Sequence, residues 1–159
     1  MRRLWNRPAD AVWSLVTQNS NQQSNMNICT YVTAISLEPK LMTVAVYAGT
    51  QTRDNLELGG QVLLQLLTEE LAPVVRVCGQ MSGAKVDKVA RLKKRYVLGT
   101  HAGLPYLQRA AGFMELIVEQ IIETSGDHTL VVGKVVIAKN LSDAPILTTT
   151  YLREKGYIR

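Results

Sequence analysis

The stretch that decides the fold runs from Phe113 to Asn140 and reads FMELIVEQIIETSGDHTLVVGKVVIAKN. Residues 113–124 and 128–140 are two long apolar runs rich in β-branched side chains, which favour strands. The short sequence Ser-Gly-Asp between them is a tight-turn signal. The sequence therefore predicts a long antiparallel hairpin in this part of the chain.

Further strand-like runs precede this hairpin. AVWSLVTQ (11–18) and NICTYVTAIS (27–36) flank the polar sequence NSNQQSN, which is the pattern of a β-hairpin. LMTVAVYAG (41–49) alternates large apolar residues with smaller or polar ones, and QVLLQLL (61–67) is a fourth apolar run. Both are predicted to be strands.

Short helices are predicted between the strands. Residues 50–58 read as a capped helix that ends at Gly59-Gly60, and Thr68 begins a second helix that Gly79 closes. Residues 84–95 form a third, basic helix, and residues 103–112 are interpreted as a connection.

The sequence thus predicts six or seven strands and three short helices, and the strands follow one another in hairpin order. This pattern favours a closed antiparallel barrel with helical insertions over a layered parallel sheet. No linker, low-complexity stretch or internal repeat interrupts the 159 residues, so we expect a single domain over 1–159.

Composition excludes several classes of protein. With 47% hydrophobic residues the chain can bury a core without disulfides. Cys29 and Cys78 have no CxxC spacing and are expected to be buried thiols in the cytoplasm. Residues 11–37 carry no charge but contain eight consecutive polar residues, so no membrane span is expected, and the N-terminus has no targeting signal.

The net charge of +5 is concentrated in one segment. Residues 85–95 hold six basic side chains and one acidic one, so this segment alone accounts for the whole excess. The apolar residues Val86, Val89 and Leu92 recur at helical spacing, which predicts a surface helix with a solvated basic face. Phosphate contact by one or two of these cations is the alternative. A nucleic-acid partner is not expected, because aromatic residues make up only 6% of the chain.

Standard catalytic motifs are absent. The chain contains no GxGxxG, GxxxxGK[ST], HExxH or GxSxG sequence. Its two histidines, His101 and His128, have no carboxylate or thiol at metal-ligand spacing, so no metal is expected. We therefore expect any chemistry to come from an organic cofactor.

Three local features indicate what that cofactor is. Residues 11–52 are crowded with hydroxyls and amides, which suit a large neutral heteroaromatic ring. The sequence Thr50-Gln51-Thr52-Arg53 lies where a strand passes into a helix, so its groups can converge on a phosphate, or the threonines only cap the helix. His128 begins the last long strand, which places it at a barrel rim, where a surface role is the alternative.

These pieces together resemble the flavin reductase-like, FMN-binding split-barrel family. Over residues 9–140 six motifs are similar to those of the family and stand in the same order: AVWSLVTQ, CTYVTAISLEPKLMTVAV, GTQTRDNLELGG, SGAKVDKVA, GLPYLQRAAGFMELIVEQ and GDHTLVVGKVV. The resemblance implies a mainly β, antiparallel split β-barrel of Greek-key character with a few short peripheral helices. It also implies a homodimer with FMN bound at the subunit interface.

The resemblance implies roles for particular residues. Thr30, Thr33 and Ala34 match positions that line the flavin ring. Thr50, Thr52 and Arg53 match the phosphate segment, with Asn55 in support. Lys88 matches the lysine of the Asp-Lys pair, and His128 matches the histidine of the Gly-Asp-His string, near the approach of the nicotinamide. Two departures are Val89 where the family often has phenylalanine, and Gly49 where it often has a basic residue.

The leading hypothesis is therefore an NAD(P)H-dependent flavin oxidoreductase. The alternative is an FMN-binding electron-transfer protein without its own NAD(P)H activity. A third hypothesis keeps the barrel and binds nucleic acid through residues 85–95. Residues 141–159 match the family only loosely and receive no role.

Overall fold

The computed structural model describes residues 4–158, which form nine strands, four α-helices and two short 3-10 helices. The strands are β1 (Trp13–Gln18), β2 (Ser24–Cys29), β3 (Val32–Leu37), β4 (Lys40–Tyr47), β5 (Gln61–Leu66), β6 (Leu98–His101), β7 (Leu104–Leu107), β8 (Gly112–Ile122) and β9 (His128–Asn140). The helices are η1 (Leu4–Asn6), α1 (Gln51–Glu57), η2 (Glu69–Leu71), α2 (Val74–Cys78), α3 (Lys88–Lys93) and α4 (Thr149–Glu154).

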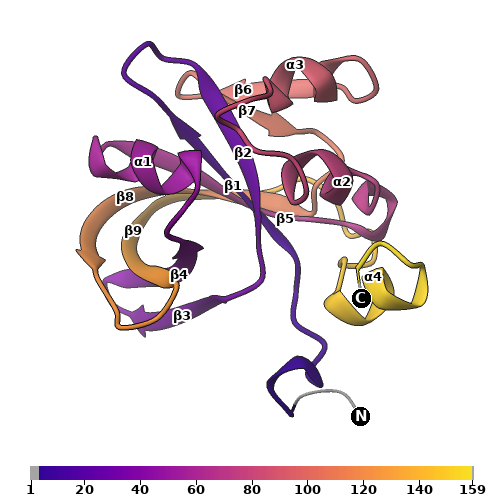
Figure 1. The fold of residues 1–159 in the computed structure, drawn as a ribbon, viewed down its shortest axis with the longest axis horizontal. Helices are drawn as coiled ribbons and strands as arrows, with labels where there is room; N and C mark the ends of the chain where they lie inside the picture. Colours follow the sequence, from indigo (N-terminus) through magenta and orange to yellow (C-terminus); the bar gives the residue numbers. More distant parts are fainter. Residues whose placement is uncertain (1–3, 159) are drawn as a thin grey trace.

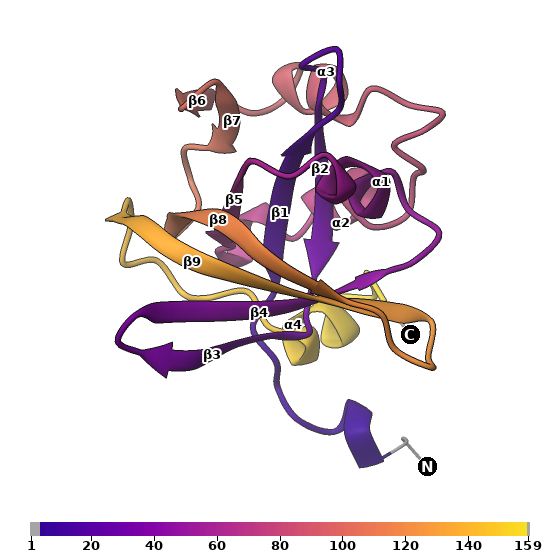
Figure 2. The same ribbon diagram turned by 90° about the vertical axis from the view of Figure 1, so that its left-hand side faces the viewer.

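Seven strands form one antiparallel sheet in the order β2-β1-β5-β8-β9-β4-β3, and β6 and β7 form a separate hairpin. Figure 2 shows β8, β9, β4 and β3 running across the view while β1 and β2 run upward, so the sheet is strongly coiled. The prediction of a mainly β, antiparallel fold with a few short helices is confirmed.

The sheet is not closed, because its edge strands β2 and β3 do not pair with each other within the described residues. The run 27–36, predicted as one strand, divides at Thr30 and Tyr31: β2 pairs with β1, and β3 pairs with β4 at the opposite edge. Successive strands of a twisted sheet are rotated relative to one another, so the two edge strands run in different directions. The chain therefore bends at these two residues as it passes from one edge strand to the other. The barrel therefore stays split.

The long hairpin predicted over residues 113–140 is confirmed. β8 pairs with β9 from Gly112 opposite Asn140 to Ile122 opposite Leu130, with two register shifts that interrupt the ladder. Such bulges bend a strand and increase its twist. On its other side β9 pairs with β4, which places His128 directly opposite Tyr47.

Both faces of the central strands are buried, which explains the unbroken apolar runs. Val62 and Leu64 of β5 belong to a core inside the coiled sheet, together with Leu15 and Leu116. Leu63 points to the other side, into a second core that packs against α2, α3, β7 and α4. A strand buried on both faces carries no polar alternation.

The helical segments lie around the sheet, with α1 and α2 against β1 and β2, and α3 above them beside the β6–β7 hairpin (Figure 1). The predicted helix 50–58 is confirmed: Thr50 Oγ1 accepts from the backbone N–H of Arg53, and Gly59 and Gly60 have φ of +70° and +98°. None of the helices in residues 4–158 is long and apolar enough to cross a membrane.

Further local predictions differ from the structure. The basic helix expected over 84–95 is shorter, because α3 begins after its N-cap Asp87 and ends at Lys93. The helix expected over 68–79 is divided into η2 and α2, because Pro73 cannot continue a helical hydrogen-bond ladder. Residues 103–112, expected to be a connection, include β7, which pairs with β6 through a turn at Ala102 and Gly103. The C-terminal tail, left without a role, buries Leu147 and Leu152 in the core.

Candidate functional site

A pocket of about 250 Å³ lies between the start of α1, strand β2 and residues 79–83. Most of its lining residues carry a polar group, and they include Asn25 and Asn27 of β2, Thr50 and Thr52 at the start of α1, and Ser82. Lys88 of α3 completes the floor. A larger cavity of about 480 Å³ lies between the β1–β2 and β6–β7 turns, but it contains none of the predicted site residues.

Helix α1 is fastened to the sheet by buried side-chain hydrogen bonds. Asn25 Nδ2 donates to Thr52 Oγ1 at 2.9 Å, and Asn55 Nδ2 donates to Thr17 Oγ1 at 3.0 Å. Gly83 lies so close to Asn25 that a Cβ there would stand 2.3 Å from Asn25 Oδ1. The side chains of Thr52 and Asn55 therefore hold the pocket wall in place, and only a glycine permits this approach of the two segments.

Lys88 is a buried cation at the pocket floor. The residue is 3% exposed, its Nζ donates to the carbonyl oxygen of Cys78 at 2.8 Å, and Asn27 Oδ1 lies 3.5 Å away. Desolvation lowers the pKa of Lys88 from its usual value. Among residues 4–158 no carboxylate lies within ion-pair distance of it. The ammonium thus has hydrogen-bond partners but no counter-ion.

Two buried thiols neighbour this lysine. Cys29 and Cys78 are free cysteines, and burial raises the pKa of each thiol to about 12. The expectation of two small buried thiols is confirmed. Thiols with such a pKa are protonated at neutral pH and do not act as nucleophiles.

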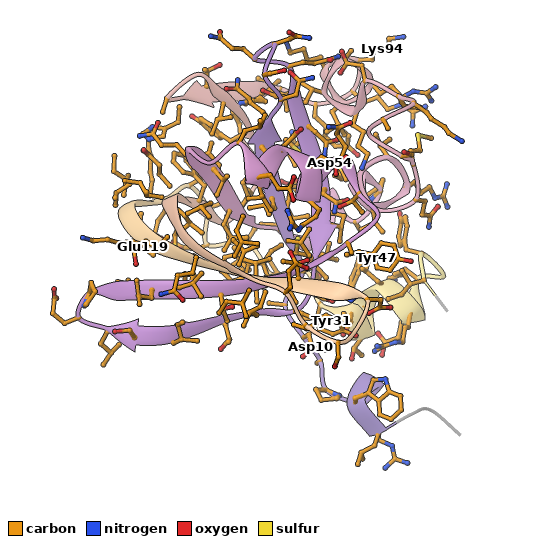
Figure 3. The ribbon with its side chains drawn as sticks, turned by 60° about the vertical axis from the view of Figure 1, so that its left-hand side comes forward. Asp10, Tyr31, Tyr47, Asp54, Lys94 and Glu119 are labelled. Carbon is orange, nitrogen blue, oxygen red and sulfur yellow. The ribbon has the colours of Figure 1, made fainter. Side chains whose placement is uncertain are left out.

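His128 is the first residue of β9, directly after the β8–β9 turn, and reaches the rim of the pocket through its contact with Tyr47. Its Nδ1 lies 2.6 Å from Asp127 Oδ1, and its ring makes edge contacts with Tyr31 and Tyr47, with centroids 5.5 Å apart in each case. Tyr47 also lines the pocket. Figure 3 shows Tyr31 and Tyr47 close together, far from Lys94, the residue that follows α3. The hydrogen bond from His128 lowers the pKa of Asp127.

Known proteins share this fold. A family model for the flavin reductase-like domain matches residues 7–156. The chain belongs to this family. The sequence resemblance stated above is therefore confirmed.

An uncharacterised protein of Archaeoglobus fulgidus is 29% identical to this flavin reductase-like chain over 114 residues, which cover 72% of the chain and 64% of the relative. A putative oxidoreductase from Sinorhizobium meliloti superposes with a TM-score of 0.79 at 20% identity, over 91% of this chain and 48% of its own. The chain thus spans less than two thirds of either protein. The styrene monooxygenase flavin reductase of Pseudomonas putida S12 superposes with a TM-score of 0.75 at 22% identity, over 91% and 88%.

The structure of this flavin reductase-like domain brings together only part of the predicted site. Thr50, Thr52 and Lys88 line the pocket, whereas Asn55 lies behind its wall. The guanidinium of Arg53 is directed at Glu57 and Glu123 and is not part of the pocket lining.

Residues Thr30, Thr33 and Ala34 lie at the split in the barrel and not in the pocket. Thr30 is half-buried, whereas Thr33 and Ala34 are exposed on β3, next to Tyr31 in the sequence. The only side-chain hydrogen bond described for the three is a long one, from Thr33 Oγ1 to the carbonyl oxygen of Ala34 at 3.4 Å.

Sequence reasoning did not assign Asn25, Asn27, Tyr31 or Tyr47 to the site. The two asparagines were visible as part of the polar stretch 11–52, but only the tertiary structure shows that they face α1 and Lys88. Among the described residues, no group of three or more metal-ligating side chains comes together.

The other histidine has a different setting. His101 Nε2 lies 2.6 Å from Glu115 Oε2, and Glu115 is 4% exposed. The pair joins the β6–β7 hairpin to β8, and the His101 ring packs against Phe113. Since a buried carboxylate needs such a partner, this pair fastens two elements of the fold.

Proposed function

We propose that this protein is an NAD(P)H-dependent flavin reductase that binds FMN in the pocket between β2, α1 and α3. The observation that carries the proposal is the buried ammonium of Lys88 on the floor of a polar pocket. A buried charge without a counter-ion is costly, and a phosphate is the anion that the family's ligand supplies. Lys88 is the one cation of the basic segment 85–95 that is buried, whereas Lys85, Arg91, Lys93, Lys94 and Arg95 are exposed.

The residues present fit a flavin mononucleotide. A pocket of about 250 Å³ is below the usual range of complete ligand sites, so it suits the phosphate and its polyol chain, with the ring outside. Lys88 would hold the phosphate, and the Asn25 and Asn27 amides lie beside the chain. The Thr50 hydroxyl donates to the carbonyl oxygen of Tyr47 at 2.9 Å, so it would have to turn from that oxygen to join Lys88 at the phosphate. Thr52 and Asn55 would act through the pocket wall that they fasten.

The ring would lie over the rim. Thr30, Thr33 and Ala34 offer backbone and hydroxyl groups at the split in the barrel, and Tyr31 and Tyr47 offer aromatic surface. Bound flavin would accept a hydride from a dihydronicotinamide, which is chemistry that belongs to the cofactor. His128 would position the nicotinamide and stabilise negative charge on the reduced ring, because its ring is held by Asp127 on one side and by two tyrosines on the others.

A second copy of the chain would complete this site. Strand β3 and its neighbour carry exposed large side chains, with Ile35 50% exposed, Leu37 84%, Tyr31 52% and Tyr47 51%. Several exposed large side chains along one edge of a sheet favour an interaction site there. We propose that it pairs with the same surface of a second copy, so that the flavin ring is covered by the dimer. Light scattering of the purified protein tests this, and a monomer contradicts it.

The remaining proposals concern cellular location, domain organisation and nucleic-acid binding. The two free buried thiols suit a reducing compartment, so we place the protein in the cytoplasm. One flavin-binding domain over residues 1–159 remains our prediction. We expect no binding to nucleic acid through the exposed cations of α3. Such binding would require a steep loss of affinity with salt.

The decisive experiment combines a spectrum with a reduction rate. The purified protein, incubated with equimolar FMN and desalted, is expected to retain flavin absorbance. Anaerobic mixing with NADH or NADPH in a stopped-flow instrument is then expected to bleach that absorbance. Retained flavin that neither nucleotide reduces would identify an electron-transfer protein instead. A protein that retains no FMN and does not reduce it as an exchangeable substrate would contradict the proposal.

A further inference from the structure

Arg53 makes a set of contacts that its place in the phosphate segment does not predict. Its Nη1 lies 3.0 Å from Glu57 Oε1, one turn along α1, and its Nη2 donates to Glu123 Oε1 at the end of β8. Its Nε donates to Thr129 Oγ1 at 3.1 Å. The side chain is 12% exposed although it lies near the surface. Nε and Nη2 of the guanidinium are thus hydrogen-bonded to the β8–β9 hairpin, whereas Nη1 faces the Glu57 carboxylate as an ion pair without a hydrogen bond.

These contacts converge on the turn that precedes His128. Thr129, the next residue, is 1% exposed, and its hydroxyl donates to Glu123 Oε2 at 3.2 Å while it accepts from Arg53. Thr124 Oγ1 donates to the carbonyl oxygen of His128 at 2.6 Å. Arg53 therefore links α1 to both strands of the β8–β9 hairpin, on either side of the turn.

The charges favour this arrangement over a move into the pocket. The hydrogen bond with Glu123 raises the pKa of Arg53 and lowers that of Glu123, so each group stabilises the charged form of the other. If the guanidinium turned toward the pocket, the carboxylates of Glu57 and Glu123 would lose their cation and the buried Thr129 hydroxyl would lose its hydrogen-bond donor. Lys88 already supplies a cation there.

We propose that Arg53 is a positioning residue for His128, which holds the β8–β9 turn on α1 and does not bind the flavin phosphate. This inference rests on the proposed function. In this inference Lys88 binds the phosphate, and Arg53 holds the rim of the pocket in place, where the His128 ring contacts two tyrosine rings.

The test uses Arg53→Gln, Glu123→Gln and the double variant in the full chain. Arg109→Gln is the control, since Arg109 forms a comparable ion pair with Glu70 on exposed side chains elsewhere, with Nη1 3.0 Å from Glu70 Oε2. We would measure Kd for FMN and for riboflavin, and the rate of flavin reduction at saturating nicotinamide nucleotide. Riboflavin lacks the phosphate, so a loss of affinity for FMN alone identifies a phosphate ligand.

Both single variants are expected to slow flavin reduction by roughly tenfold and to change the Kd for FMN by less than about threefold, because a small displacement of a positioned group slows the reaction. The double variant is expected to match the single ones, since both ends of one contact are removed. A fall of tenfold or more in affinity for FMN but not riboflavin in Arg53→Gln, with Glu123→Gln unaffected, would overturn the inference.

A second measurement is independent of flavin. The Cε1 proton of His128 lies near two tyrosine rings, so its chemical shift in an NMR spectrum reports the position of the ring between them. The resonance of His101, whose ring packs against Phe113 and not against these tyrosines, is an internal reference. Both variants are expected to shift or broaden the His128 resonance and leave that of His101 in place. A protein that binds no flavin would contradict the proposed function. A His128 resonance that is unchanged in both variants would overturn the positioning role of Arg53, whether or not flavin binds.

Discussion

The floor and the rim of the candidate flavin pocket differ in burial. Lys88 on the floor is 3% exposed, and Thr52 in the adjoining wall is fully buried. On the rim, Tyr31 and Tyr47 are each about half exposed, at 52% and 51%. His128 stands between these two tyrosines, with its side chain 32% exposed.

This difference separates two kinds of contribution. Floor residues are held by packing against the sheet, so changing them alters stability and ligand affinity together. Rim residues have few covering neighbours, so changing them should alter catalysis and leave the fold intact. The predictions below test this separation, beginning with the largest free-energy effect.

The largest effect is expected from alkaline pH, through the two thiols beside Lys88. The pKa of Cys29 and of Cys78 is raised from 9.0 to about 12 by burial, so between these values the unfolded chain has lost protons that the folded chain keeps. The stabilisation is complete below pH 9 and is lost as pH rises toward 12, by on the order of 4 kcal/mol for each thiol. Urea unfolding at pH 7, 9, 10 and 11 measures it.

The control for this prediction is the variant Cys29→Ala/Cys78→Ala, whose stability should fall less steeply above pH 9. Lys88 acts in the opposite direction, because its lowered pKa makes folding more favourable as pH rises toward 10.5. If the unfolding free energy of the wild type changed as little with pH as that of the double variant, the two thiols would not be shielded from water.

The second effect concerns the charge on the floor. Lys88→Met removes a charge-assisted hydrogen bond to phosphate, so we expect the Kd for FMN to rise by roughly 10- to 100-fold and that for riboflavin to change by less than about threefold. The free energy of unfolding should change as well, but by less than the affinity, because losing the hydrogen bond to the Cys78 carbonyl oxygen opposes the gain from removing a desolvated ammonium. Fluorescence titration with both flavins measures the two constants.

The matched control is Lys94→Met, which removes an exposed cation from the same helical segment. It should leave both flavin affinities unchanged. Equal losses for FMN in the two variants would mean that the general field of the basic helix, and not the buried ammonium, attracts the phosphate.

The third effect belongs to the rim. His128→Ala is expected to slow flavin reduction by about tenfold, since one positioned polar group is lost, while FMN stays bound. Its melting temperature should match that of the wild type, because the ring packs only against half-exposed tyrosines. Stopped-flow reduction and thermal unfolding measure the two quantities. Loss of FMN from this variant would place His128 in the binding site for the flavin itself.

The smallest effect is expected for Asp127→Asn. The Asp127 side chain is 76% exposed and contacts the His128 ring through one hydrogen bond, which the amide oxygen of asparagine can retain. Flavin reduction should slow by less than about threefold. A loss as large as that of His128→Ala would show that the carboxylate charge, and not only the hydrogen bond, is needed at the rim.

Local sequence patterns predicted many of the elements but not their partners. The hairpin of residues 113–140 and helix α1 depend on signals a few residues apart, such as the Ser-Gly-Asp turn and the Thr50 cap, and both are confirmed. The run 27–36 was wrongly predicted as one strand, because periodicity does not show that successive halves pair at opposite edges of a sheet.

The candidate site shows the same limit. Lys88 was singled out by resemblance to a motif, yet its burial depends on Cys78 and on strand β2, which packs against α3. Arg53 was assigned to phosphate from its place in the sequence, whereas its carboxylate partner Glu123 is 70 residues away. Contacts over such separations leave no local pattern.

Local patterns in the sequence were enough to predict the fold class and the family, because these follow from turn residues, apolar periodicity and the order of the motifs. Only the tertiary structure decided which cation of the basic segment is buried, which polar side chains share the pocket, and that the sheet stays open at Thr30 and Tyr31. Burial and charge pairing are properties of the packed molecule, since both depend on neighbours that folding brings together.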